Sequence, residues 1–230
     1  MTQDNKYWYL RNHRLFEQMS SKEIEDLAIV SNMKNAVKNE IIFFSEPEVK
    51  RIFFLKAGTV KICRKDETGK EIITEMLTEG DIFGHLHLAS NKDEYAIVLS
   101  DQVKLCFFEV PDFMNVLRNN PNLSIKYADV VNEKLVSFQQ KYEDLIFKDV
   151  DTRVLDFFRR YAKHHGKTIG NRVEMEMLLT HRDIADYTAS SRQSVTTIIN
   201  KLEEKGKLIY EGRKKVIIPD IRNFLSDSGV

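Results

Sequence analysis

The sequence predicts an α+β protein with an N-terminal jelly roll or barrel of antiparallel strands, a long helix, and a C-terminal winged helix-turn-helix. Three observations predict this fold class. Short apolar runs rich in Val, Ile and Phe, separated by turn residues, fill residues 36–110. Residues 122–148 contain neither Pro nor Gly, and residues 180–206 have the pattern of two helices joined by a tight turn. We therefore expect a β-domain with N-terminal helices at 1–121, the long helix at 122–148, and the winged helix-turn-helix domain at 149–230.

The composition favours a globular chain of two domains. Of the 230 residues, 42% are hydrophobic, and the 35 basic and 35 acidic residues cancel. The charge is nevertheless segregated, because from Val150 onward 15 basic residues outnumber 11 acidic ones, a net charge of +4. A basic excess beside a helix-turn-helix is typical of a nucleic-acid-binding domain. The sequence shows no signal peptide and no run of about 20 apolar residues, so we expect a cytoplasmic protein with no membrane partner.

The cysteines and the motif content argue against redox and catalytic chemistry. Cys63 and Cys106 each lie in an apolar, strand-like run, which favours buried reduced thiols. An iron–sulfur cluster held by thiolates needs about four cysteines, so the sequence excludes one. The chain also lacks the GxxxxGK[ST], HExxH and GxSxG motifs, and we therefore expect no enzymatic activity.

The N-terminal part predicts helices followed by strands. Ser20 and Glu23 have the spacing of a capping box, which indicates the start of a short helix. Turn signals then separate the strand-like runs, at Gly58, residues 67–70 and Gly80. Strands at this spacing imply an antiparallel barrel or sandwich.

The long helix at 122–148 carries a heptad pattern of about three repeats, the lower limit for a coiled coil. One interpretation is a helix packed on its own β-domain. The other, which we favour, is a seam between two protomers, because a helix-turn-helix usually binds a two-fold site as a dimer. Residues 149–151 are the expected hinge to a helix at 152–165. The seam residues are Ala128, Val131, Leu135, Phe138, Tyr142 and Leu145.

The helix pair at 180–206 is the part with the clearest function. Ser190 or Ser191 can cap its second helix, since either hydroxyl can accept from a free backbone amide. An apolar stripe follows at i, i+3, i+4 and i+7, formed by Val195, Ile198, Ile199 and Leu202. The alternative is an ordinary amphipathic hairpin with a solvated polar face. The positions of Ala185 and Ala189 favour the helix-turn-helix, although Gly is usual where Ala189 stands.

The outward face of the second helix contains base-reading residue types, since Arg suits guanine and Gln suits adenine in the major groove. After Gly206, two short strands around Glu211 and Gly212 predict a wing whose basic residues touch phosphate. We therefore expect double-stranded DNA as the partner. The predicted DNA-binding residues are Ser191, Arg192, Gln193, Thr196, Thr197, Lys201, Arg213 and Lys214, with Asn200 on the same face.

These three parts, in this order, resemble the CRP/FNR family of bacterial transcription regulators over nearly the whole chain. The residues that carry the resemblance are Gly58 in FFLKAGTV, the GDIFG run at 80–84, Arg153, and SRQSV in the second helix of the pair. The resemblance implies a cyclic-nucleotide-binding-like β-domain and a homodimer on a pseudo-palindromic DNA site, and it admits RNA polymerase as a further partner. It assigns Arg192 to base contact, with Gln193 and Thr197 at neighbouring positions. Many members have Glu and Arg at those two positions, so we expect a different operator.

The effector pocket departs from the family pattern. Members that bind cyclic nucleotides typically read FGE and, further on, Arg-Ser-Ala or Arg-Thr-Ala. Here the matching residues of the candidate pocket are Gly84, His85, Glu94 and Tyr95. A carboxylate where the family has a guanidinium removes a bidentate donor and adds a like charge near the phosphate. We therefore expect no cAMP binding in the usual manner, with Tyr95 filling the space.

His85 and His87 raise a metal or haem hypothesis, because some family members sense gas through haem. No Cys, His or carboxylate cluster nearby completes such a site, so we expect no metal and no cofactor, and the effector is unknown. Two alternatives to a DNA-binding regulator stay open. One is a small-molecule sensor whose winged helix contacts a protein partner, and the other is a regulatory subunit of a catalytic partner.

Overall fold

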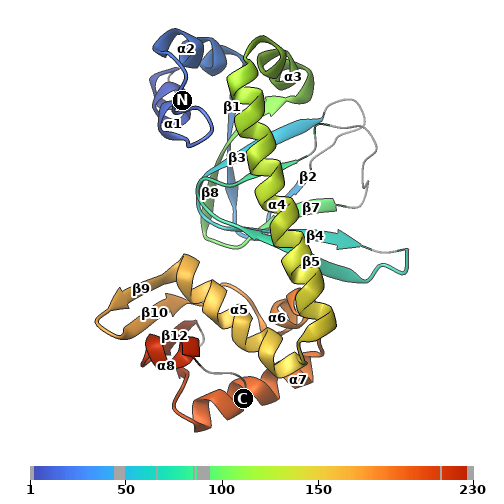
Figure 1. Cartoon of the computed structure of the whole chain (residues 1–230), viewed down its shortest axis with the longest axis vertical. Coiled ribbons are helices and arrows are strands. Elements are labelled where there is room, and N and C mark those ends of the chain that lie inside the picture. The colour runs from blue at the N-terminus through green and yellow to red at the C-terminus, as the bar shows by residue number, and fades with distance from the viewer. Residues whose placement is uncertain are drawn as a thin grey trace. The chain divides into compact units, whose positions relative to one another are not determined.

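The computed structural model describes residues 3–43, 50–65, 67–84, 86, 94–212 and 214–226. The chain forms two compact units, Met1–Val136 and Ser137–Val230, called here the N-terminal and C-terminal units. Figure 1 shows strands and short helices in the first and a mainly helical arrangement in the second. The division falls inside the long helix, so the three segments expected from the sequence stay a prediction.

The N-terminal unit begins with two short helices, α1 (Gln3–Asn12) and α2 (Ser21–Val30). The predicted capping box at the start of α2 is confirmed. The Glu23 amide donates to Ser20 Oγ at 3.3 Å, and the Ser20 amide donates to the Glu23 carboxylate at 2.7 Å. Both bonds satisfy backbone amides that a helix start leaves unpaired.

Two four-stranded antiparallel sheets follow, which confirms the predicted β-domain. The first has the strand order β1-β8-β3-β6 and the second β2-β7-β4-β5, so each sheet combines strands that are distant in sequence. The first sheet contains β1 (Asn32–Val37), β3 (Arg51–Ala57), β6 (Ile82–Gly84) and β8 (Gln102–Glu109). The second contains β2 (Ile41–Phe43), β4 (Val60–Lys65), β5 (Glu71–Leu77) and β7 (Glu94–Val98).

The first sheet has an apolar core on each face, because successive side chains of a strand point to opposite sides. On β3, Phe53 joins a core shared with apolar residues of the second sheet, such as Val60 and Ile62. The next residue, Phe54, joins a core with residues of the helices and with Phe16 of the segment between α1 and α2. The first sheet therefore anchors both the second sheet and the helices.

The structure confirms two predictions about small features of this unit. Gly58 forms the turn between β3 and β4 at φ +94°, and a Cβ there would lie 2.6 Å from the Gln102 carbonyl oxygen, so a side chain does not fit. Cys63 and Cys106 are fully buried, and neither forms a disulfide. Burial raises the pKa of the Cys106 thiol to about 12, which keeps it protonated and inert.

The β-domain is followed by two helices, α3 (Val110–Asn119) and α4 (Pro121–Phe147). The helix α3 was not expected from the sequence. It places Pro111 in its first turn and buries Phe113 and Leu117. The long helix α4 is continuous over 27 residues. None of the described helices is long and apolar enough to cross a membrane.

The C-terminal unit contains the predicted helix pair and wing on a small sheet with the strand order β11-β12-β10-β9. The first hairpin of this sheet, β9–β10, was not predicted, since its strands are short and most residues of β9 are exposed. The elements of the unit are α5 (Val150–His165), β9 (Gly166–Ile169), β10 (Arg172–Glu176), α6 (His181–Tyr187), α7 (Arg192–Glu204), β11 (Ile209–Glu211), β12 (Lys215–Ile218) and α8 (Ile221–Ser226).

Candidate nucleic-acid interface and effector site

The second helix of the predicted pair, α7, begins at Arg192 because Ser191 caps it. The Ser194 amide donates to Ser191 Oγ at 2.9 Å, so of the two candidate caps the structure selects Ser191. The predicted apolar stripe is confirmed. Its four residues are each at most 2% exposed: Val195, Ile198, Ile199 and Leu202.

Burial of that stripe leaves the polar face of α7 outward. The exposed side chains on it are Arg192, Gln193, Thr197, Asn200 and Lys201, and Thr196 is half-buried. Two of these residues bond to their own helix, since Thr196 Oγ1 donates to the Arg192 carbonyl at 2.9 Å and Thr197 Oγ1 to the Gln193 carbonyl at 3.0 Å. Among the residues that the structure describes, none forms a hydrogen bond or ion pair with the Arg192 guanidinium, which stands on the first turn of α7. It is therefore available to a base edge.

The turn between α6 and α7 contains Ala189 at φ +49°, a left-handed conformation that costs a residue with a side chain roughly 1 kcal/mol. The Arg153 guanidinium on α5 holds this turn. Its Nε donates to the Thr188 carbonyl at 2.9 Å and its Nη2 to the Ala189 carbonyl at 3.2 Å. Its Nη1 donates to the Lys148 carbonyl at 2.7 Å. The Arg153 side chain therefore links the segment after α4 to the turn that precedes α7.

Charged groups fix the last turn of α4 to α5. Asp144, 4% exposed, lies 2.7 Å from Lys148 Nζ and 3.1 Å from Arg160 Nη1, and Lys148 also reaches Asp156 at 2.7 Å. Burial opposes ionisation of Asp144, but the hydrogen bonds from Lys148 and Arg160 outweigh it and hold the Asp144 pKa below its ordinary value. The expected hinge begins at Asp149, whose carboxylate caps α5 by accepting from the Thr152 amide at 2.8 Å.

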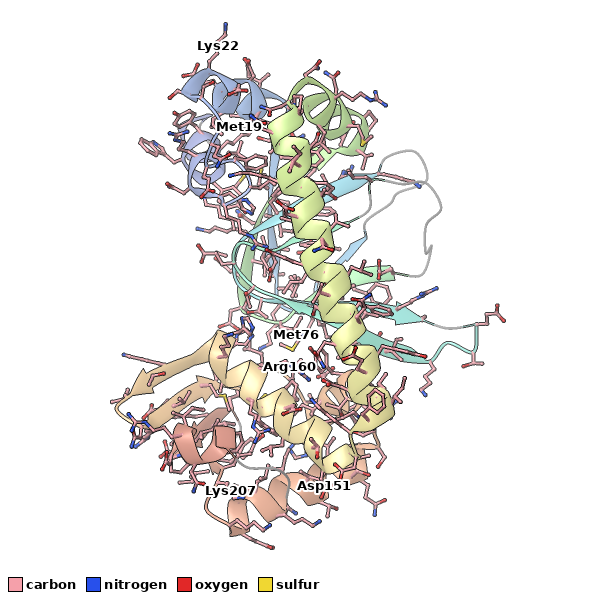
Figure 2. The ribbon with its side chains drawn as sticks, in the orientation of Figure 1. Met19, Lys22, Met76, Asp151, Arg160 and Lys207 are labelled. Carbon is pink, nitrogen blue, oxygen red and sulfur yellow. The ribbon has the colours of Figure 1, made fainter. Side chains whose placement is uncertain are left out.

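The wing is confirmed as the antiparallel pair β11–β12, with Gly212 at φ +73° in its turn. Lys214 Nζ lies 3.4 Å from the Glu176 carboxylate, and both side chains are more than half exposed. On α7, Lys201 Nζ lies 3.6 Å from the carboxylate of Asp151, a residue at the start of α5 that is labelled in Figure 2. Exposed pairs of this kind contribute little, so both lysines can exchange their carboxylate for a DNA phosphate. Arg213 lies outside the described residues.

The candidate effector pocket has its described polar groups engaged within the protein. Tyr95 on β7 is 6% exposed and its hydroxyl donates to the Glu71 carboxylate in a short hydrogen bond. Burial, followed by Glu71, raises the pKa of Tyr95 above its ordinary value, so the hydroxyl stays a donor. Lys61 Nζ also lies 3.8 Å from Glu71, and Lys65 Nζ lies 5.4 Å from the centre of the Tyr95 ring.

The backbone at Gly84 also leaves little free space. Gly84 adopts φ +102°, and a Cβ there would lie 2.5 Å from the Arg51 carbonyl oxygen. Glu94 is half-buried, and it stands opposite Arg64 in the register of β7 with β4. His85 and His87 lie outside the described residues. Among the residues that the structure describes, no three His, Cys, Asp or Glu side chains gather as metal ligands do.

Two residues with a role in these sites, Glu71 and His181, were not predicted from the sequence, and neither were the contacts of a third, Arg153. Glu71 is paired with Tyr95 only because β4 lies between β5 and β7. Arg153 was noticed as part of a resemblance, but its three carbonyl partners are up to 36 positions away. His181 meets Thr196 of α7 at 3.0 Å. No local spacing signals these contacts, since each depends on the tertiary arrangement.

Two family models match the chain. Residues 33–120 match the cyclic nucleotide-binding domain, and residues 152–224 match the Crp-like helix-turn-helix domain. The chain is 29% identical over 184 residues to the global nitrogen regulator of a Nostoc species, which covers 79% of this chain and 82% of the relative. It is 24% identical over 168 residues to the cAMP-activated global transcriptional regulator CRP of Salmonella typhimurium, covering 72% and 80%.

Solved structures show the same fold. FixK2 from Bradyrhizobium japonicum matches with a TM-score of 0.74 at 17% identity, over 87% of this chain and 99% of FixK2. A mutant of CooA from Carboxydothermus hydrogenoformans matches with a TM-score of 0.72 at 18% identity, over 96% and 97%. The two matched domains and the curated relatives agree on a non-enzymatic regulator that binds DNA through its helix-turn-helix. The chain belongs to the CRP/FNR family of transcription regulators.

Proposed function

We propose that the protein binds a pseudo-palindromic DNA site as a homodimer, without a cyclic nucleotide bound in the usual manner. The observation that carries the proposal is the contrast on α7 between its buried apolar stripe and its exposed polar face. A helix of about 10–12 Å diameter fits the major groove, and its outward side chains then meet base edges.

The residues divide into base readers and phosphate contacts. Arg192, Gln193 and Thr197 stand exposed along the first turns of α7, where a recognition helix reads bases. Lys201 and Lys214 hold exposed carboxylates weakly and are placed for phosphate, with Arg213 as a further cation of the wing. Ser191 and Thr196 complete the set, the first as the cap of α7 and the second beside its polar face.

The seam of α4 supports the dimer. Its large apolar side chains stand exposed within the single chain: Val131 is 49% exposed, Leu135 53%, Phe138 65%, Tyr142 59% and Leu145 48%. Exposed apolar residues at heptad spacing on one helix are buried when a second copy supplies the same stripe. A two-fold partner also doubles the recognition helices, which matches a pseudo-palindrome.

The proposal also concerns the effector. One relative is named for activation by cAMP. In this chain Glu94 and Tyr95 replace the donor groups that phosphate recognition uses, and Tyr95 is tied to Glu71. We place neither a cyclic nucleotide nor haem in the pocket. Regulation of transcription further requires that the bound dimer act on RNA polymerase, by contact or by blocking its promoter.

Selection of duplexes from a random DNA pool tests the proposal. The expected result is an inverted repeat whose half-sites lie about 10 bp, or a multiple of that spacing, from centre to centre. Selection should succeed without any cyclic nucleotide. Enrichment of a sequence without two-fold symmetry would overturn the dimeric arrangement, and failure to enrich any sequence would overturn α7 as a base reader.

A further inference from the structure

His181 lies between the recognition helix and the wing. It is the first residue of α6, and its Nδ1 lies 3.0 Å from Thr196 Oγ1 on α7. Its ring centre lies 6.5 Å from that of Tyr210 on β11, with the ring planes 71° apart. An imidazole is thus fixed beside the polar face of α7, on the side of the wing, and no DNA-binding role has been assigned to it.

Proton accounting determines which nitrogen of His181 is available. A threonine hydroxyl has one proton, and Thr196 Oγ1 donates it to the Arg192 carbonyl at 2.9 Å. The bond between His181 and Thr196 therefore has His181 Nδ1–H as its donor. Nε2, on the other side of the ring, has no hydrogen-bond partner among the described residues. It is a bare acceptor when the imidazole is neutral and an N–H donor when it is protonated.

Charged and titratable groups from three elements surround His181. On α7, the Arg192 guanidinium opposes protonation and the Glu203 carboxylate favours it. On β11, Tyr210 presents its ring. On α6 itself, the Asp183 carboxylate accepts from Thr180, and Arg182 donates to Asp186 at 3.0 Å. Burial, followed by Arg192, holds the His181 pKa below its ordinary value of 6.5 in the DNA-free protein.

We propose that His181 donates a hydrogen bond from Nε2 to a backbone phosphate of the bound DNA and takes up one proton from solvent as the complex forms. The phosphate adds a negative charge beside Nε2 to that of Glu203, and it also compensates for Arg192. The inference rests on the proposed function, because it requires α7 in the groove.

The linkage has a definite sign. The complex binds more protons than the free protein, so DNA affinity is highest at low pH, below the lowered His181 pKa of the free state. Affinity then falls as pH rises through the higher pKa of the complex, and it levels off above that value. The ratio between the two plateaus is about tenfold per protomer for each unit by which DNA raises the pKa.

The test is the affinity for one duplex, measured by fluorescence anisotropy from pH 5.5 to 8.5 at constant ionic strength. Wild type should bind more weakly as pH rises. His181→Gln keeps a side-chain amide that can donate to Thr196 but does not titrate, so its affinity should change little with pH. His181→Arg carries a permanent charge and should bind tightly across the range. His164→Gln, which removes an exposed histidine of α5, is the matched control and should keep the wild-type profile.

A second readout separates a phosphate contact from a structural role. At pH 6, His181→Gln should reduce the salt dependence of binding by about one phosphate contact per protomer. Superimposable pH profiles for wild type and His181→Gln would overturn the proposal, and so would a uniform loss of affinity at unchanged salt slope. If wild type bound no duplex at any pH, the proposed function itself would fail and this inference with it.

Discussion

The polar face of α7 and the region around Tyr95 use similar side chains in opposite ways. On α7, Arg192 and Gln193 stand exposed above a fully buried stripe. Around Tyr95, the buried hydroxyl donates to the Glu71 carboxylate, and the Lys61 ammonium forms an ion pair with the same carboxylate at 3.8 Å. A surface that keeps its donors free can bind a partner, whereas a cluster that satisfies its own groups gains little from a ligand.

We infer from this difference that DNA binding depends on the C-terminal unit and that the N-terminal unit does not bind a cyclic nucleotide in the usual manner. The C-terminal unit retains the capped recognition helix, the clamped turn and the basic wing. The N-terminal unit has the two-sheet fold, but Glu94 and Tyr95 stand where the family resemblance predicts the donors of nucleotide-binding members. A fold can persist without its ligand, because the sheets depend on buried apolar residues and ligand binding on a few polar ones.

The largest expected effect concerns the exposed apolar side chains of α4. Leu135→Lys places an ammonium on each side of the proposed seam, where burial of charge is unfavourable by several kcal/mol, on the order of 3 or more. The dimer should dissociate, and DNA affinity should fall with it. Light scattering measures the mass directly.

Val136→Lys is the matched control for that variant. Val136 is the adjacent residue on α4 and is similarly exposed, at 55%, but it lies off the seam. It should leave the dimer intact. An unchanged dimer for Leu135→Lys would mean that the stripe on α4 is not the interface.

Arg192→Ala tests the exposed face of α7 itself. Loss of one bidentate base contact should cost roughly 1–3 kcal/mol of binding free energy and relax the preference at one base pair of each half-site. Competition among duplexes that differ at single positions measures both quantities. Equal losses for every sequence would show that Arg192 contacts the backbone and reads no base.

A smaller and different effect is expected from the wing. Lys214→Ala removes a cation that the exposed Glu176 holds only weakly, so the variant should bind all sequences less tightly by a similar factor. Its salt slope should fall by about one contact per protomer. A change in sequence preference would contradict the assignment of Lys214 to phosphate.

The smallest effect belongs to the region around Tyr95. Tyr95→Phe removes the hydroxyl that bonds to Glu71, and it should lower the free energy of unfolding by about 0.5–1.5 kcal/mol without altering DNA affinity. Chemical denaturation measures the first quantity and anisotropy the second. A marked loss of DNA affinity at unchanged stability would show that this cluster takes part in DNA binding.

The elements that sequence could predict depend on neighbours along the chain. The Ser20 capping box and the buried stripe from Val195 to Leu202 follow from spacings of three and four residues, and both are present. The sequence alone left the cap of α7 open between Ser190 and Ser191, because either hydroxyl has the required chemistry. The cap is identified by the backbone geometry, which places the Ser194 amide within hydrogen-bond distance of Ser191 Oγ.

The features that escaped prediction depend on contacts between distant residues. Tyr95 and Glu71 meet because β7 and β5 flank β4, an order that no local pattern encodes. Arg153 clamps a turn 35 positions later, and it supports the positive φ of Ala189 where glycine would need no support. The role of such residues can be assigned only once the fold is known.

The proposed function is tested most directly by the affinity of the purified protein for its operator with and without millimolar cAMP or cGMP. We predict equal dissociation constants and an unchanged melting temperature. A nucleotide present at 100 times its dissociation constant would add about 2.7 kcal/mol to stability, a shift that melting readily detects. Tighter operator binding in the presence of cAMP, together with a raised melting temperature, would contradict the account. It would show that the region around Glu94 and Tyr95 still receives a cyclic nucleotide.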